Sequence, residues 1–493
     1  MAGLFGVASK SYDLAGEKGK LGSIDCLFYG TDYHSHLGTA RGGMATIDAG
    51  GKFHRYIHNI SNAQFRYKFE DDVKKLRGNL GIGVISDYED QPLVISSHLG
   101  KYAIVSVNRI TNLDEIVEEA FKRKTAHFAE TGTGELNPSE VIATLINQGA
   151  SYVEGIVNSQ EAIKGSSSLL LLTKEGIYAA RDALGRTPLI LGKKEGTYAI
   201  ASESCALPNL GFEVEKELGP GEIVLVTPGG VERKKKQKEE IQICSFMWVY
   251  FGYPASGYEG VNVEDARYRC GKALARQDAE DLKSGKLKID MVAGIHDSGT
   301  GHAIGYANES GINFGRPFVK YTPTWPRSFM PPDQEMRDLI ARMKLIPLKE
   351  LVKGKRLLFC EDSIVRGTQL KDTVQRLYDA GAIEVHMRPA CPPLIYGCDF
   401  LNFSRARSAN ELAGQKAIRA LRGISKDTPI PTELLKLYGN SNTQEYSEMV
   451  DWIRRDLKLT TLKYQKLGDL VKAIGLPKEK LCTHCWDGSS CFA

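Results

Sequence analysis

One twelve-residue segment constrains the fold of this chain more than any other, and it spans residues 357–368. It begins with an apolar run, continues with the adjacent acids Glu361 and Asp362, and ends in a small, polar and basic loop before a helical pattern. A loop leading into a helix presents backbone N–H groups and the helix dipole to a phosphate. Gly367 allows close backbone approach, and the two carboxylates suit Mg²⁺ or ribose hydroxyls. A surface turn with solvated acids is the alternative, but the complete pattern favours a phosphate site.

The rest of the second half alternates between strand and helix patterns. A helical pattern at 300–309 and another after residue 368 separate its apolar strand patterns. Such alternation predicts an α/β domain with a parallel sheet and helices on both faces. Ligands of these sheets bind beyond the carboxyl ends of the strands, where the acidic pair lies. The expected strands are 289–295, 355–360 and 383–387.

The first half has a different rhythm, with short strands at close intervals and helices set apart. Helical patterns occupy 113–122 and 139–147, and Ser139 is the expected N-cap of the second. This arrangement predicts an α+β layered domain. The charge run Glu232–Glu240 then breaks the pattern, so we expect one domain at 1–235 and another at 236–493. The expected strands of the first domain include 168–173, 176–180 and 197–202.

Charge and hydropathy exclude several classes of function. The 64 Lys and Arg against 60 Asp and Glu give a net charge of +4, which provides no electrostatic reason to expect nucleic acid as a main partner. No apolar run approaches the ~18 residues of a membrane span. Charged residues follow the first apolar residues too early for a secretory signal. We therefore expect a cytoplasmic protein without a membrane partner.

The segment at 357–368 resembles the phosphoribosyl pyrophosphate (PRPP) motif of phosphoribosyltransferases, and further motifs narrow the resemblance to the glutamine phosphoribosylpyrophosphate amidotransferases. The resemblance spans nearly the whole chain. It implies an N-terminal Ntn-hydrolase-like αββα glutaminase domain and a C-terminal type I phosphoribosyltransferase domain with a parallel sheet. The matching segments are 181–189, 201–207, 297–300, 303–306, 309–312, 342–345 and 408–412.

The resemblance also implies the residues of a PRPP site. Ser298, Glu361 and Asp362 correspond to the Mg²⁺ positions, although the family usually has Asp where this chain has Glu361. The PRPP-binding set is Asp297, Ser298, Gly299, Thr300, Glu361, Asp362, Ser363, Ile364, Val365, Arg366, Gly367 and Thr368.

Cations aimed at pyrophosphate would stabilise the charge that develops as it leaves C1 of PRPP. Lys320, Arg327 and Lys344 are the candidates, each of which could instead be a solvated surface residue. The family's mobile loop normally contains an Arg-Tyr pair, which is absent from the matching stretch here, and two prolines stiffen that stretch. Loop closure over the site is therefore an open question for this chain.

The glutaminase chemistry that the resemblance implies is missing. Ala2 stands where the family has its N-terminal cysteine nucleophile, and a methyl group cannot attack glutamine. The family's carboxylate-gripping arginine strand falls on Val84–Asp87, and its oxyanion-hole pair falls on Val107 and Asn108. Pro138 replaces the acid that holds the glutamine amino group, and the family's His-Arg-Gly-Gln-Glu has become His36–Ala40. We expect a retained fold without glutaminase activity.

Four of the ten cysteines match family positions that carry a metal cluster. They come from three separated segments: Cys244, Cys398, and the pair Cys482 and Cys485. Four thiolates suit a [4Fe–4S] cluster, with Zn²⁺ as the chemical competitor, and the family resemblance favours iron–sulfur. Four free thiols are the alternative. The expected role is structural, fastening the C-terminal tail to the transferase domain.

These features together favour a Mg²⁺-dependent enzyme that makes 5-phosphoribosylamine from PRPP and ammonia, the first step of purine nucleotide synthesis. The alternative is a catalytically silent paralogue that senses PRPP or nucleotides and partners an active homologue. Another amine or a nucleobase as acceptor is a third hypothesis. By resemblance, we also expect a homo-oligomer regulated by purine nucleotides.

Overall fold

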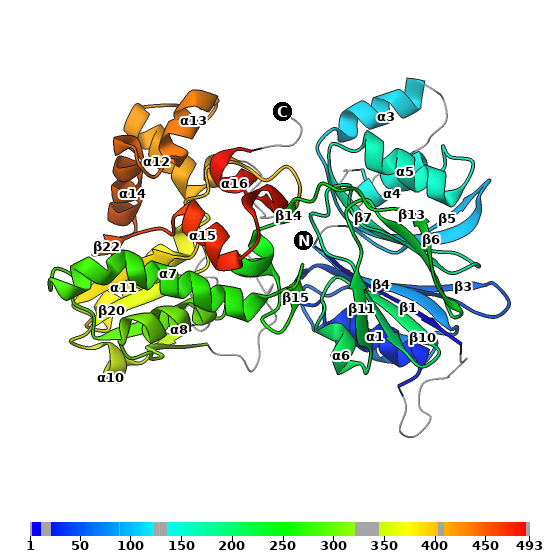
Figure 1. The fold of residues 1–493 in the computed structure, drawn as a ribbon, viewed down its shortest axis with the longest axis horizontal. Helices are drawn as coiled ribbons and strands as arrows, with labels where there is room; N and C mark the ends of the chain where they lie inside the picture. The colour runs from blue at the N-terminus through cyan, green and yellow to red at the C-terminus, as the bar shows by residue number, and fades with distance from the viewer. Residues whose placement is uncertain are drawn as a thin grey trace.

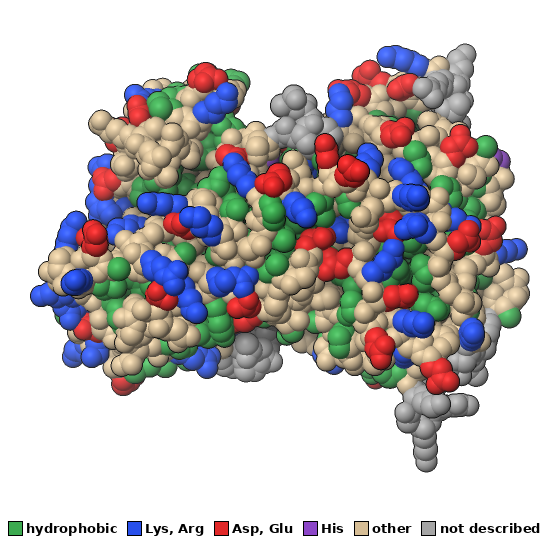
Figure 2. All heavy atoms as spheres, in the orientation of Figure 1, with side chains coloured by type: hydrophobic (Ala, Val, Ile, Leu, Met, Phe, Trp, Pro, Cys, Tyr) green, Lys and Arg blue, Asp and Glu red, His purple; other side chains and the backbone are tan. Residues whose placement is uncertain are grey.

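A computed structural model describes residues 2–10, 21–87, 89–122, 128, 136–320, 345–402 and 409–489. The two halves of the chain form two lobes that lie side by side (Figure 1). The N-terminus and the last helix both lie in the middle, where the lobes meet (Figure 1). The face shown in Figure 2 mixes Lys and Arg with Asp and Glu, in keeping with the net charge of +4.

The first lobe contains two antiparallel sheets. One has the strand order β11-β9-β10-β1-β4-β2-β3, and the other has the order β13-β12-β8-β7-β6-β5. Successive residues of a strand point to opposite faces: in β1, Leu4 enters the core between the sheets, whereas Phe5 packs against the outer helices. The strands are β1 Ala2–Ser9, β2 Arg41–Ile47, β3 Phe53–Asn59, β4 Leu80–Ser86, β5 Leu93–Ser97, β6 Gly100–Ile110, β7 Gly165–Leu172, β8 Ile177–Ala180, β9 Ile190–Lys194, β10 Thr197–Ala201, β11 Glu213–Glu217, β12 Ile223–Thr227 and β13 Gly230–Lys235.

Helices cover the outer faces of both sheets, which gives four layers in the order αββα. Leu27 of α1 and Phe65 of α2 pack outside the first sheet, in the same core as Phe5. Ile142 of α4 and Ile156 of α5 pack outside the second sheet. The helices are α1 Ser23–Asp32, α2 Phe65–Val73, α3 Leu113–Lys122, α4 Pro138–Ile146, α5 Tyr152–Ala162 and α6 Ala206–Asn209.

The second lobe is built on a parallel sheet with the order β17-β20-β21-β22. Its central strand β20 is buried on both faces: Leu358 and Cys360 enter one core, and Leu357 and Phe359 enter another. A strand buried on both sides needs an almost continuous apolar sequence, as this one has. The strands are β17 Met291–Gly294, β20 Arg356–Glu361, β21 Glu384–Pro389 and β22 Thr461–Leu462.

Helices cover both faces of the parallel sheet. One group, with α7 and α8 packed together, shares the core of Leu358 and Cys360, and the other shares the core of Leu357 and Phe359. The first group is α7 Val263–Lys283, α8 Gly299–Ser310 and α15 Leu467–Ile474. The second group includes α10 Lys349–Val352, α11 Thr368–Asp379, α12 Ala413–Arg422, α13 Thr432–Gly439 and α14 Gln444–Asp456.

Short elements join the lobes and the tail. The tail strand β23 pairs in parallel with β14, the first strand after β13, so the end of the chain returns to the junction of the lobes. The remaining elements are β14 Ile243–Cys244, η1 Met247–Phe251, β15 Gly257–Tyr258, β16 Val261–Asn262, β18 Phe318–Lys320, β19 Leu345–Pro347, η2 Ala409–Glu411, η3 Lys478–Lys480, β23 Leu481–Cys482 and α16 His484–Asp487. Among the described helices, none has both the length and the apolar composition needed to cross a bilayer.

The prediction that Ser139 caps a helix is wrong. Pro138 is already the first residue of α4, and the side chain of Asn137 accepts a hydrogen bond from the Ser139 N–H. The Ser139 hydroxyl instead lies 2.8 Å from the hydroxyl of Ser106 on β6. The Ser139 side chain therefore contacts a residue distant in the sequence, and Asn137 caps the helix in its place.

Candidate functional site

The phosphate loop, residues 361–368, connects the end of β20 to the start of α11. Glu361 is the last residue of the strand and Thr368 the first of the helix. Between them, Gly367 has a φ of +77°, in the left-handed region that favours glycine. A Cβ at this position would lie 3.0 Å from the side chain of Leu457. Gly367 therefore serves the turn that directs the N-terminus of α11 toward the end of β20.

A second helix N-terminus lies beside this loop. Ser298 is the N-cap residue of α8, and its hydroxyl donates a hydrogen bond to Asp362. The hydroxyl of Ser363 donates to the other carboxylate oxygen of Asp362 at 2.6 Å. A Cβ on Gly299 would lie 2.3 Å from the carbonyl oxygen of Cys360, so only glycine permits this approach of α8 to β20. Asp297, Thr300 and the phosphate loop are thus placed at one edge of the sheet.

The carboxyl groups of Glu361 and Asp362 are adjacent at the end of β20, and their ionised forms repel each other. Burial raises the pKa of Asp362, against the lowering effect of its serine partners. Burial and the adjacent Asp362 together raise the pKa of Glu361 well above its usual value. A cation that prefers oxygen ligands would offset this repulsion, because both carboxyl groups could then bind it in their ionised form. The carboxylates and the Ser298 hydroxyl therefore fit Mg²⁺ in their chemistry.

Two basic residues expected near this site form ion pairs with acidic side chains. The ammonium of Lys320, at the end of β18, lies 2.5 Å from a carboxylate oxygen of Asp297. Arg366 in the phosphate loop forms an ion pair with Glu411 at 2.9 Å. Arg327 and Lys344 lie outside the described residues.

Sequence reasoning missed Arg267 on α7. This side chain is 4% exposed, and its guanidinium donates to the backbone oxygens of Trp248, Tyr250 and Gly252 at 3.0 Å. Its positive charge also lowers the pKa of Asp362, against the effect of burial. No motif marks this arginine, because its partners are carbonyl groups that any sequence supplies.

The described residues of the first lobe place Ala2 at the start of β1, opposite Ser86 on β4. Ser86 is the residue that the sequence resemblance aligns with the expected glutamine-binding arginine. Its hydroxyl donates to Glu89 at 3.2 Å, and the amide of Gln91 donates to the same oxygen at 3.1 Å. Burial raises the pKa of Glu89. A buried acid therefore lies within hydrogen-bond distance of Ser86.

Two of the other expected glutamine-site positions, Asn108 and His36, make side-chain hydrogen bonds within the protein. The amide of Asn108 donates to the hydroxyl of Ser106 at 2.7 Å, and Ser106 contacts Ser139, which follows Pro138 at the start of α4. His36 lies 2.8 Å from the buried carboxylate of Glu203. These side chains have partners within the protein.

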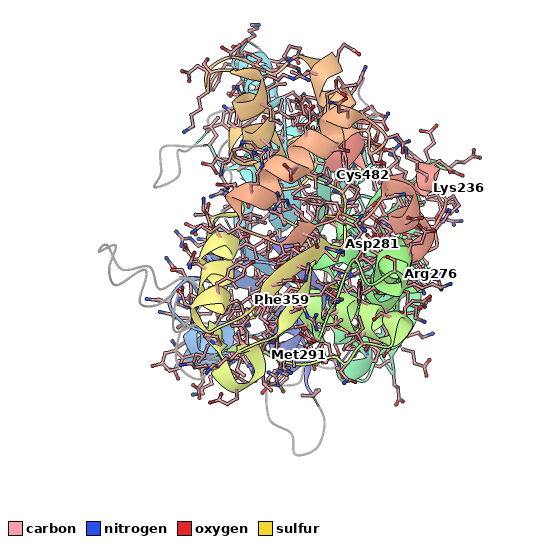
Figure 3. The ribbon with its side chains drawn as sticks, turned by 90° about the vertical axis from the view of Figure 1, so that its left-hand side faces the viewer. Lys236, Arg276, Asp281, Met291, Phe359 and Cys482 are labelled. Carbon is pink, nitrogen blue, oxygen red and sulfur yellow. The ribbon has the colours of Figure 1, made fainter. Side chains whose placement is uncertain are left out.

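The four expected metal-binding cysteines come together at the junction of the lobes. Cys244 on β14 lies in register with Cys482 on β23. The hydrogen bond from the Cys485 thiol lowers the pKa of Cys398 to about 6, with further help from backbone N–H groups. Burial raises the pKa of Cys244 well above its usual value, and Cys482 and Cys398 add to this effect. Figure 3 shows Cys482 well separated from Phe359 of β20.

Among the described residues, no group of three His, Cys, Asp or Glu side chains is arranged to hold a single metal ion. In a [4Fe–4S] cluster each thiolate binds a different iron, so the four sulfurs need not converge on one point. A tetrahedral zinc site requires all its ligands within about 2.3 Å of one ion. Four cysteine thiols are a donor set that suits a [4Fe–4S] cluster and also suits zinc.

Comparison with known proteins shows the family. The amidophosphoribosyltransferase of Methanocaldococcus jannaschii is 31% identical over 516 residues, with 99% of this chain and 97% of that protein covered. The chain belongs to the amidophosphoribosyltransferase family. The amidophosphoribosyltransferase of Synechocystis is 32% identical, with 75% of each chain covered. A family model described as a glutamine amidotransferase domain matches residues 78–209 of this family member.

Two solved structures resemble this family member over almost their whole length. The glutamine PRPP amidotransferase of Bacillus subtilis, complexed with ADP and GMP, superposes with a TM-score of 0.80 at 26% identity, covering 99% of this chain and 97% of that one. A structure described as the allosteric regulatory enzyme of purine biosynthesis gives a TM-score of 0.79 at 27% identity, covering 99% and 96%. These matches confirm the expected fold class, a glutaminase-type lobe joined to a phosphoribosyltransferase lobe.

Proposed function

We propose that this chain transfers the 5-phosphoribosyl group of PRPP to ammonia and forms 5-phosphoribosylamine and pyrophosphate, the first step of purine nucleotide synthesis. The observation that carries the proposal is the phosphate loop with the half-buried Glu361 and the buried Asp362, flanked by the N-termini of α8 and α11. Family membership supports the same reaction. We retain the division into domains at 1–235 and 236–493 as part of this proposal.

The loop at 363–368 would surround the 5′-phosphate of PRPP. The backbone N–H groups at the N-terminus of α11 and the hydroxyls of Ser363 and Thr368 supply donors for its oxygens. Asp297–Thr300 would contribute the opposite wall, because Ser298 is held against Asp362 by a hydrogen bond.

Ser298, Glu361 and Asp362 would hold Mg²⁺ with the pyrophosphate of PRPP. A bound Mg²⁺ would neutralise part of the negative charge that develops on pyrophosphate as its bond to C1 breaks. The chain's own task is to place these two carboxyl groups and the Ser298 hydroxyl at the end of β20, where the Ser298 hydroxyl already contacts Asp362. Lys320, together with Arg327 and Lys344, would add positive charge on the pyrophosphate side.

We infer that ammonia, rather than glutamine, supplies the nitrogen. Its lone pair forms the new bond to C1 while pyrophosphate leaves, and the extra proton passes to water. Ala2 offers no nucleophile, and neither Ser86 nor the buried Glu89 offers a positive charge for the carboxylate of glutamine. Both features oppose the glutaminase half-reaction, one through chemistry and one through charge.

We also propose a [4Fe–4S] cluster on Cys244, Cys398, Cys482 and Cys485, with Zn²⁺ as the alternative. The cluster would fasten β23 and α16 of the tail to β14 and to the loop of Cys398. Its contribution is structural: thiolates from three separated segments are held together by one group.

The test of the transferase proposal is pyrophosphate release by the whole chain with PRPP, Mg²⁺ and ammonium. We expect release with ammonium and at least a hundredfold loss in Asp362→Asn, because an amide cannot supply the negative charge that the cation needs. Asp265→Asn, which removes an exposed acid of α7, is the matched control and should keep its activity.

Two results would contradict the transferase proposal. Calorimetry that finds no binding of PRPP with saturating Mg²⁺ would remove its basis. Tight PRPP binding without pyrophosphate release from ammonium would support the silent, sensing paralogue instead.

A further inference from the structure

Arg186 lies in the first lobe, between β8 and β9, but its side chain reaches the cysteines of the second. One of its terminal N–H groups donates to the sulfur of Cys482 at 2.5 Å. Another donates to the side-chain oxygen of Gln242 at 3.2 Å. The backbone oxygen of Arg186 also accepts a hydrogen bond from the N–H of Cys244 at 3.2 Å. One arginine thus touches two of the four cysteines.

An aromatic ring fixes the plane of this guanidinium. The central carbon of the Arg186 guanidinium lies 3.3 Å from the centre of the Phe400 ring, and Phe400 follows Cys398 by two residues. The side chain is 1% exposed. A guanidinium stacked on an aromatic face and excluded from water is held in one orientation. Its hydrogen bond to Cys482 is therefore a built contact and not a chance position of a flexible side chain.

Burial makes the positive charge of the Arg186 guanidinium depend on negative charge nearby. A buried guanidinium is costly unless negative charge lies near it. Asp399, which follows Cys398, is close enough to interact electrostatically with Arg186 and supplies part of that charge. A thiolate of Cys482 bound to metal would supply more, directly at the hydrogen bond.

We propose that Arg186 is a positioning residue of the four-cysteine site, where its hydrogen bond to Cys482 stabilises the bound cluster and raises its reduction potential. This inference rests on the proposed [4Fe–4S] cluster. Its consequence is that the glutaminase-type lobe, without chemistry of its own, supplies the positive charge for a metal site whose ligands all come from the other lobe.

The direction of the effect follows from charge. A nearby cation stabilises the reduced, more negative state of a cluster more than the oxidised state. Removing the charge should therefore lower the reduction potential, and it should also weaken the hold on the thiolate that the arginine contacts. Lysine retains the charge but cannot reproduce the planar fork, so Arg186→Lys should lie between wild type and Arg186→Gln.

The experiment uses the whole chain purified without oxygen. Iron per chain and visible absorption establish the cluster in the wild type. Reductive titration then gives the midpoint potential, and the half-time of iron loss to a chelator gives retention. In Arg186→Gln we expect iron loss to be about tenfold faster. We expect the potential to fall by an amount equal to a tenfold change in the reduction equilibrium, about 59 mV for one electron.

Arg181→Lys is the matched control. Arg181 is a buried arginine in the same loop, and its guanidinium donates to the carbonyl oxygens of Thr187, Leu218 and Gly185, so a general loosening of the loop would appear there too. The potential of the control should stay at the wild-type value. If Arg186→Gln fails to fold, Arg186→Lys and Phe400→Leu give the same comparison.

Two outcomes would overturn the inference, and they are distinguishable. Iron in the wild type with an equal potential and equal retention in the Arg186 variants contradicts the role of Arg186 alone. A wild-type protein that binds no iron contradicts the proposed cluster and the inference together.

Discussion

At the scale of single residues, Glu217 and Glu259 form an acidic pair between the lobes. The backbone N–H of Glu259 donates to both carboxylate oxygens of Glu217 at 2.9 Å. Arg181 lies 2.8 Å from Glu259. Burial raises the pKa of Glu217 to about 7; the hydrogen bond from the Glu259 backbone N–H opposes this rise, and the negative charge of the Glu259 side chain adds to it. The folded state therefore keeps a proton on Glu217 under conditions where the unfolded chain has lost it.

This pair predicts a pH dependence of stability. Because the folded pKa lies above the usual 4.5, the folded state binds more protons between pH 4.5 and 7, and the free energy of unfolding falls as the pH rises through that window. Glu217→Gln should flatten the dependence, since an amide does not titrate. Urea unfolding from pH 5 to 8 measures it, with the exposed Glu213 of the same strand changed to Gln as control. An equal slope in wild type and Glu217→Gln would contradict this account.

A second prediction concerns the lost nucleophile. Ala2→Cys should still release no glutamate from glutamine, because Ser86 and Glu89 would remain where the family uses a positive charge. Glutamate formation, measured with glutamine alone and with PRPP and Mg²⁺ added, checks the expectation, and Ala2→Ser controls for the change of size. Turnover of glutamine by Ala2→Cys would show that the first lobe lacks only its thiol.

The sequence indicated residues whose partners are their neighbours along the chain, but not residues whose partners lie far away in the sequence. The acids Glu361 and Asp362 and the turn glycine Gly367 could be recognised from their order along the chain. Arg186 and Arg267 could not, because their partners lie at positions distant in the sequence and carry no pattern.

At the scale of elements, the turn between β20 and α11 depends on backbone conformation. Gly367→Ala places a Cβ at a φ of +77°, a conformation that costs an L-residue roughly 1–2 kcal/mol, and brings it 3.0 Å from Leu457. We expect at least a tenfold weaker affinity for PRPP, measured by calorimetry, because the N–H groups of the loop would shift.

Gly423→Ala is the matched control for this substitution. Gly423 ends α12 with a φ of +65°, and a Cβ there would meet open space. The variant should lose stability to a similar extent without losing PRPP affinity. Equal affinity in wild type and Gly367→Ala would remove the phosphate role of this turn.

The sequence predicted a strand well where the strand is buried on both faces of its sheet. The strand expected at 355–360 is β20, Arg356–Glu361, because its apolar run fits only a strand covered on both faces. The strand expected at 168–173 begins earlier, since β7 starts at Gly165. Its serines at 166–168 are buried in the sheet, which polarity alone does not reveal.

At the scale of the whole molecule, the two lobes have different proposed roles: the second carries the proposed transferase site, and the first carries no proposed reaction. The family comparisons cover nearly the entire chain, so the glutaminase-type lobe is retained in fold. Within this lobe Asn108 donates a hydrogen bond to Ser106, and Arg186 reaches the cysteines of the other lobe. The order of strands in each sheet could not be read from sequence, because it depends on contacts between segments far apart along the chain.

The most direct test of the central claim follows the nitrogen atom. Wild-type protein receives PRPP and Mg²⁺ together with ammonium and glutamine, only one of which carries ¹⁵N, and mass spectrometry measures the label in the phosphoribosylamine product. The account predicts label from ammonium and none from the glutamine amide. Label that arrives from glutamine would contradict it.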